Sequence, residues 1–165
     1  MHLNHLVRHR TAFILFILFL TVGCDQLTKF IAEKYLDHAP ASDYLGGFFR
    51  LELVQNPGAF LSLGAKLSDS MRFWILTVAV AFSLVAIAVL LTRKRSTLTF
   101  TTGFSLVLGG GIGNLIDRIE HGSVTDFLNI GIGSLRTGIF NIADVAIMVG
   151  IGFVALDLFQ NPKDC

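Results

Sequence analysis

Four segments of this chain are long and apolar enough to cross a lipid bilayer as helices. A helical span needs about 20 mostly apolar residues. The second and third segments carry no charge, whereas ionisable side chains interrupt the first and the fourth. The sequence therefore predicts a single membrane domain over residues 1–165, with spans at about 11–32, 73–91, 97–116 and 138–156 and external loops at about 36–70 and 117–137.

The amino-acid composition agrees with a membrane protein and argues against several other classes. Hydrophobic residues make up 53% of the chain and charged residues 15%, whereas soluble domains carry about 25% charged residues. A formal net charge of +1 gives no reason to expect a nucleic-acid partner. The two cysteines, Cys24 and Cys165, are too few for a disulfide framework or a zinc cluster.

Basic residues predict which way the spans cross the membrane, because Lys and Arg gather on short cytoplasmic loops. With four spans, both chain ends and the loop between the second and third spans lie on one side. That side carries Arg8, Arg10, Arg93, Lys94, Arg95 and Lys163. The basic residues of the other side are spread over longer loops and interleaved with acids: Lys66, Arg72, Arg118 and Arg136. We therefore expect both termini in the cytoplasm.

The first external loop contains a strand signal. Residues 50–53 alternate polar and apolar side chains, which is the period of a half-buried strand. Asn56-Pro57-Gly58 is a turn signal that ends it. The segment that follows is expected to rest on the membrane surface because it carries the apolar residues Phe60, Leu61 and Leu63.

Glycines mark two further features. Gly109 and Gly113 form a GxxxG pair in the third span, which favours close packing of helices. A nucleotide-binding loop is a poor match, because Asn114 stands where a dinucleotide fingerprint needs its last glycine. In the second external loop, Gly131 and Gly133 are expected to interrupt regular structure.

Polar and ionisable residues gather at the external ends of the spans. Burying a charged side chain at the centre of a membrane helix costs at least ~2.5–3.5 kcal/mol, so each one needs a reason. The set is Asp25, Lys29, Asn114, Asp117, Arg118, Asn141 and Asp144, with Asp126 in the second external loop. Asp144 is six residues past Gly138, so we expect it about 9 Å along the fourth helix.

Sequence spacing sorts these groups into pairs. Asp25 and Lys29 are four residues apart, which predicts an ion pair on one helical face. Asp117 is expected to be neutralised by the neighbouring Arg118. Both pairs are interpreted as structural.

Asp126 and Asp144 differ from the other acids, because neither has a basic residue three or four positions away. Two unpaired carboxylates near the same depth predict a dyad that shares one proton and activates water without a metal. No histidine pair has metal-ligand spacing, and neither HExxH nor GxSxG occurs. A metal held by carboxylates is the alternative that spacing alone leaves open.

Five segments in order resemble the motifs of the lipoprotein signal peptidases (signal peptidase II). They are DQLTK at 25–29, NPGAF at 56–60, GNLIDR at 113–118, VTDF at 124–127 and FNIAD at 140–144. Three positions depart from the usual pattern. One small residue, rather than two, precedes Phe60; Thr125 replaces a Val; and the stretch before Phe140 lacks Trp-Pro.

The resemblance implies an all-α membrane protein of four transmembrane helices with a small external β-cradle. It implies a bacterial cytoplasmic (inner) membrane location, with the site near the external face, and an aspartic peptidase that cleaves diacylglyceryl-modified prolipoproteins before the lipidated cysteine. Asp126 and Asp144 match the catalytic pair, with no metal and no cofactor. Substrate-binding or supporting roles fall on Asp25, Lys29, Asn56, Gly58, Asn114, Asp117, Arg118 and Asn141. Lipid-modified prolipoproteins and membrane lipids are the expected partners of a monomer.

Two other functions fit parts of the pattern. Arg8, Arg10, an apolar run and Cys24 imitate a lipoprotein signal peptide, but three further spans follow. Intramembrane Asp and Lys are also typical of transporters. A transporter would carry polar groups through the full membrane depth, whereas the inner halves of the second and third spans are apolar.

Overall fold

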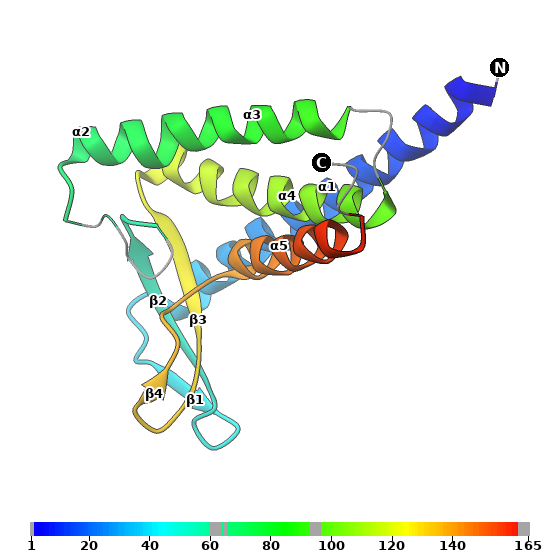
Figure 1. The fold of residues 1–165 in the computed structure, drawn as a ribbon. Helices are drawn as coiled ribbons and strands as arrows, with labels where there is room; N and C mark the ends of the chain where they lie inside the picture. Colours follow the sequence, from blue (N-terminus) through cyan, green and yellow to red (C-terminus); the bar gives the residue numbers. More distant parts are fainter. Residues whose placement is uncertain (1, 60–63, 65, 93–96, 162–165) are drawn as a thin grey trace.

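The computed structural model describes residues 2–59, 64, 66–92 and 97–161, with side chains from residue 8 onward. Within these ranges, four helices are long and apolar enough to cross a membrane: Arg8–Leu36, Asp69–Leu91, Leu98–His121 and Ile142–Gln160. Figure 1 shows the helices as a bundle with a sheet at one end. The predicted fold class is confirmed.

Each span is one helix or a continuous series of helical segments. The first belongs to α1 (His2–Leu36), and the third and fourth are α4 (Leu98–His121) and α5 (Ile142–Gln160). The second combines α2 (Asp69–Arg72), a π-helical segment η2 (Phe73–Ala79) and α3 (Val80–Leu91).

The predicted glycine pair packs α4 closely against α1. A Cβ atom added to Gly109 would lie 2.8 Å from the Thr21 Cβ, and one added to Gly113 would lie 2.4 Å from the Asp25 Oδ2. Side chains larger than hydrogen would therefore force the two helices apart. The prediction of close packing is confirmed.

The two glycines inside this pair serve two other helices, which the GxxxG pattern did not predict. A Cβ added to Gly110 would lie 2.4 Å from the Ala143 carbonyl oxygen of α5, and one added to Gly111 would lie 2.4 Å from Leu84 of α3. Consecutive residues of a helix point in different directions, so this glycine run lets three helices approach α4 at one level.

The segments between the first and second spans and between the third and fourth spans form one antiparallel sheet, here called the cradle. Its strands are β1 (Ser42–Tyr44), β2 (Phe49–Asn56), β3 (Val124–Ile132) and β4 (Leu135–Arg136), in the order β1-β2-β3-β4. The central β2–β3 pairing joins these two segments and contains an irregularity between Leu51 and Val54. The predicted strand is therefore longer than residues 50–53, and it ends at Asn56 where the turn signal placed its end.

Two helix boundaries differ from the sequence prediction in ways that move site residues. Helix α4 continues to His121 rather than residue 116, so Asp117 and Arg118 are helical. Helix α5 begins at Ile142 rather than at Gly138, because Asn141 forms a capping box with Asp144. Asp144 therefore lies in the first turn of α5, and the predicted position about 9 Å inside the helix is wrong.

The loop between the third and fourth spans is more regular than predicted. Gly131 lies inside β3 and pairs with Arg136, so it does not interrupt the strand. Only Gly133, with φ of 58°, occupies the turn between β3 and β4. The Gly131 N–H donates to the Phe48 carbonyl oxygen at 3.0 Å.

Contacts at the opposite end of the bundle join neighbouring helix ends. Arg10 Nη2 donates to the Leu91 carbonyl oxygen at 2.8 Å, and the Thr97 hydroxyl donates to the Asp157 carboxylate. The predicted membrane-surface residues Phe60, Leu61 and Leu63 and the basic residues Arg93, Lys94, Arg95 and Lys163 lie outside the described residues.

Candidate active site

Lys29 is the centre of a buried charge cluster at the cradle end of the bundle. Its ammonium nitrogen lies 2.8 Å from Asp25 Oδ2 and 2.9 Å from Asp117 Oδ2, and it donates to Asn114 Oδ1 at 3.0 Å. These four residues are called the Lys29 cluster. The three partners match the three N–H donors of an ammonium group. The predicted Asp25–Lys29 pair is confirmed.

The predicted pairing of Asp117 with Arg118 is wrong. Neighbouring residues on a helix do not face each other, and Asp117 instead pairs with Lys29. Arg118 points toward the loop after β2, where its Nη2 donates to the Gly58 carbonyl oxygen at 3.0 Å. Arg118 Nε is buried and has no hydrogen-bond partner among the described residues.

The two acids of the Lys29 cluster also hold other elements in place. Asp25 Oδ1 accepts from the backbone N–H of Ala143 at 2.9 Å, and Asp117 Oδ2 accepts from the backbone N–H of Thr125 at 3.0 Å. The cluster therefore connects α1 and α4 with the start of α5 and with β3. In each of these two elements the next residue is a predicted catalytic aspartate: Asp144 follows Ala143, and Asp126 follows Thr125.

Asparagine side chains bridge the Lys29 cluster and the two aspartates. Asn114 Oδ1 accepts from Lys29, which leaves its amide nitrogen to donate to Asp144 Oδ1 at 2.9 Å. Asn141 Nδ2 donates to Asn114 Oδ1 at 3.0 Å and to Asp126 Oδ1 at 2.7 Å. Lys29 can only donate, so it fixes the direction of the Asn114 amide, and Asn114 in turn fixes that of Asn141.

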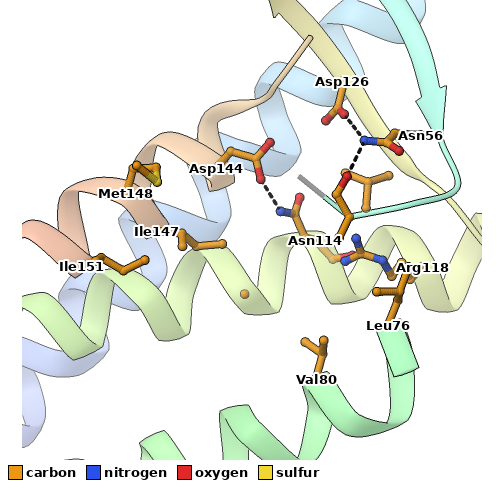
Figure 2. A pocket seen from close by; sticks show the side chains of 13 residues that line it. Asn56, Leu76, Val80, Asn114, Arg118, Asp126, Asp144, Ile147, Met148 and Ile151 are labelled. Carbon is orange, nitrogen blue, oxygen red and sulfur yellow. Dashed lines mark hydrogen bonds between the residues drawn. The ribbon is translucent and has the colours of Figure 1, made fainter. Parts of the chain in front are cut away.

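Asn56, the last residue of β2, completes the surroundings of Asp126. Its amide nitrogen donates to Asp126 Oδ2 at 2.9 Å, and its oxygen accepts from the Gly58 N–H at 2.9 Å. Figure 2 shows Asn56 beside Asp126, and Asn114 beside Asp144. Asp126 and Asp144 therefore accept hydrogen bonds from asparagine amides, whereas Asp25 and Asp117 form ion pairs with Lys29.

Five of the ten predicted site residues line one cavity of about 320 Å³, and the others support it from behind. Asp126 and Asp144 both line it, together with Asn56, Asn114 and Arg118. Apolar side chains of the second and fourth spans form much of the remaining wall in Figure 2: Leu76, Val80, Ile147, Met148 and Ile151. The cavity thus has a polar end at the cradle and an apolar end between two membrane helices.

Asp126 lies on β3, outside the spans, with 2% of its surface exposed. Burial raises its pKa from the ordinary value of 3.8 to about 6; the hydrogen bond from Asn56 opposes this rise, and the charge of Asp144 adds to it. Desolvation and a like charge both disfavour ionisation. One carboxyl group of the pair is therefore able to hold a proton near neutral pH.

Sequence reasoning missed several polar residues that support the site. Thr125 is buried, donates from its hydroxyl to Glu33 Oε1 at 2.8 Å and accepts from Gln55 Nε2 at 3.1 Å. Gln26 donates to Asp117 Oδ1 at 3.0 Å. Glu33 had a detectable signal, because it lies four residues after Lys29 on the same helical face. Gln26 and Gln55 had none.

Across the described residues, no group of three or more His, Cys, Asp or Glu side chains is placed to hold a metal ion. The absence of a metal from the reaction stays a prediction of the sequence.

The family model described as signal peptidase (SPase) II matches residues 17–160. Lipoprotein signal peptidases resemble the chain over most of both lengths. That of Oleidesulfovibrio alaskensis is 35% identical over 86% of this chain and 91% of its own, and that of Syntrophus aciditrophicus is 36% identical over 85% and 88%. A solved bacterial membrane enzyme has the same fold, with a TM-score of 0.80 and 25% identity over 93% of this chain and 91% of its own.

Proposed function

The chain belongs to the signal peptidase II family of lipoprotein signal peptidases, and we propose that it cleaves prolipoproteins with water activated between Asp126 and Asp144. The observation that carries this mechanism is that both carboxylates line one cavity and accept hydrogen bonds from asparagine amides. Family membership supports signal-peptide cleavage of prolipoproteins by a membrane peptidase. It also displaces the lipoprotein and transporter hypotheses.

The proposed reaction needs one ionised and one protonated carboxyl group. The ionised carboxylate takes a proton from water, whose oxygen attacks the scissile carbonyl carbon, while the protonated carboxyl group hydrogen bonds to the carbonyl oxygen. The tetrahedral intermediate then collapses as a proton passes to the departing amide nitrogen and the peptide C–N bond breaks. The raised pKa of Asp126 supports a shared proton, and a coupled pair titrates as a unit.

Two neighbouring groups are proposed to hold the peptide backbone. Arg118 Nε has a free N–H donor within the described residues and borders the cavity. Gly58 and Asn56 form the tight turn that brings β2 up to Asp126. A buried donor without a partner is costly in the empty site, so a substrate carbonyl that accepts from Arg118 would relieve that cost.

The apolar end of the cavity supports a lipid-modified substrate. Leu76 and Val80 face Ile147 and Ile151 across the cavity, at the depth where the second and fourth spans cross the membrane. A diacylglyceryl group would keep its chains in such surroundings while the peptide reaches the aspartates. We propose cleavage just before the lipidated cysteine by a monomer, with both termini in the cytoplasm of a bacterium and the site at the external face of the inner membrane.

The test is cleavage of a diacylglyceryl-modified prolipoprotein by the purified chain in lipid. The expected product begins with the lipidated cysteine, and the same precursor without lipid should be cut at least about tenfold more slowly. The chain should also restore prolipoprotein processing in a bacterium that lacks its own lipoprotein signal peptidase. Cleavage at another bond, or equal cleavage of both precursors, would contradict the proposal.

A further inference from the structure

The end of the cradle farthest from the bundle exposes large apolar side chains from two turns at once. Leu135 is 83% exposed, and Leu45 and Ile132 are each 77% exposed. With the less exposed Tyr44 and Phe48 they form a patch here called the cradle tip. Contiguous apolar patches on a protein surface commonly mark a contact with a partner or a membrane.

Backbone and side-chain contacts hold the two turns of the cradle tip together. Arg136 Nη1 donates to the Gly47 carbonyl oxygen at 2.7 Å, and the Gly131 N–H donates to the Phe48 carbonyl oxygen at 3.0 Å. The first bond joins β4 to the turn after β1, and the second joins β3 to the same turn. The tip therefore presents its apolar residues as one unit.

Strand register separates polar from apolar side chains in this part of the sheet. Asp43, Arg50 and Asn129 occupy facing positions on β1, β2 and β3, and Arg50 forms an ion pair with Asp43. The next residues along, Tyr44, Phe49 and Ile130, face one another on the opposite side. Successive residues of a strand point to opposite faces, so this end of the cradle is amphipathic.

The cradle tip lies beside the outer ends of the helices rather than above them. Figure 1 shows β2 and β3 running across the helix direction, so that the tip projects sideways near the level at which α5 begins. The segment between β4 and α5 continues the apolar surface. Thr137 and Phe140 share a second cavity, of about 240 Å³, with Val145 and Val149 on α5.

We propose that the cradle tip inserts into the membrane leaflet on the side of the active site, with its apolar side chains among the upper acyl chains. Three observations favour lipid as the occupant: the depth of the tip, its continuity with a membrane-spanning helix, and its aromatic and aliphatic composition. Aromatic side chains are enriched at the membrane interface, and an amphipathic element binds there through its apolar face. The strand that ends in the tip at Ile132 also carries Asp126, so lipid would hold the far end of β3, while the bond from the Thr125 N–H to Asp117 holds its near end.

Tryptophan fluorescence tests this insertion without reference to catalysis. Trp74 is the single tryptophan of the chain, so Trp74→Phe gives a dark background to which Leu135→Trp or Phe48→Trp is added. Each full-length variant is placed in phosphatidylcholine vesicles whose acyl chains are brominated near the glycerol or near the chain end. In lipid brominated near the glycerol, the fluorescence of both tip variants should be at most about half of that in unbrominated lipid. Their emission should also be blue-shifted.

Asp37→Trp in the same background is the matched control, because Asp37 follows the outer end of α1 and its side chain is 62% exposed. Its fluorescence should respond to acrylamide in the water and little to brominated lipid. Acrylamide quenching of both tip variants equal to that of the control would overturn the proposal. Tip variants shielded from both quenchers would indicate a protein partner or a second copy, which would overturn it as well.

Discussion

Lys29 and Asn114 are joined by a 3.0 Å hydrogen bond across 85 positions of sequence, and that bond orients the amide group that faces Asp144. Reversing the Asn114 amide would place an N–H group against an ammonium and an oxygen against a carboxylate. The charge cluster at the cradle end of the bundle is therefore connected to the proposed dyad by hydrogen-bond direction as well as by packing.

Removing Lys29 should cost more stability than removing one acid partner. Lys29→Met leaves Asp25 and Asp117 both buried without a counter-ion, and breaking a buried pair costs about 3–5 kcal/mol. Asp25→Leu combined with Lys29→Met should recover only part of this loss, because Asp117 remains unpaired. The expected coupling is roughly 0.5–3 kcal/mol.

The measurement is a thermal melt in detergent of the two single variants and the double variant. Lys34→Met is the control, because Lys34 lies on the same helix and is exposed. Strictly additive losses for Asp25 and Lys29 would show that the two residues do not stabilise each other.

The sequence predicted contacts within one helix better than contacts between elements. Asp25 and Lys29 meet because helix geometry alone brings residues four apart together. Asp117 has the same geometry available with other residues of α4, yet its partner comes from α1. The packing of glycines between α1 and α4 decides that pairing, and packing partners are not encoded in local spacing.

The sequence contains a signal for the true start of α5 that the count of apolar residues from Gly138 did not use. Asn141 followed three residues later by an acid is a helix-capping signature, and it places the first helical residue at 142 rather than 138. The contacts of Thr125 with Glu33 and Gln55 had no such signature, because they require the β2–β3 register. Motif matching identified the residues of the site, while the hydrogen bonds among them needed the fold.

Asp126→Asn and Asp144→Asn should each reduce cleavage to less than about a tenth. Two carboxylates that act as one unit lose function together, so the two losses should be similar. Asp126→Asn should keep or gain melting temperature, because it removes a like charge from the cavity. Asp43→Asn alters an exposed carboxylate of the cradle and should cleave normally.

The assay follows release of the signal peptide from a lipidated precursor, with folding checked by the melt of each variant. Activity above about a tenth in either dyad variant would remove that residue from the proposed chemistry.

Asp126 should make the folded protein less stable as the pH rises from about 4 to about 6. Its pKa is raised in the folded state, from 3.8 to about 6, so the folded protein holds the proton over this interval while the unfolded chain has lost it. The stabilisation is complete at pH values below the pKa of the unfolded chain and is lost as the pH rises through the pKa of the folded protein. The difference between the two pKa values corresponds to at most about 3 kcal/mol of the free energy of unfolding.

Melting temperatures measured across this pH range should fall with pH in the natural chain, and the fall attributable to this group should vanish in Asp126→Asn. Asp43→Asn should leave that fall in place, because the Arg50 guanidinium lowers the pKa of Asp43. Identical pH profiles for Asp126→Asn and the natural chain would contradict the assignment.

Gly110→Ala should separate α4 from the start of α5 and thereby weaken the site. The new methyl group would lie 2.4 Å from the Ala143 carbonyl oxygen, and overpacking of this kind costs about 1–3 kcal/mol. Moving Ala143 outward also moves Asp144, whose bond from Asn114 is 2.9 Å long. Cleavage should therefore fall at temperatures at which the variant is still folded.

Gly23→Ala is the matched control, because an added Cβ there meets nothing within 4 Å, and alanine is a better helix former by up to about 1 kcal/mol. A Gly110→Ala protein that melts and cleaves like Gly23→Ala would show that the α4–α5 contact does not position Asp144.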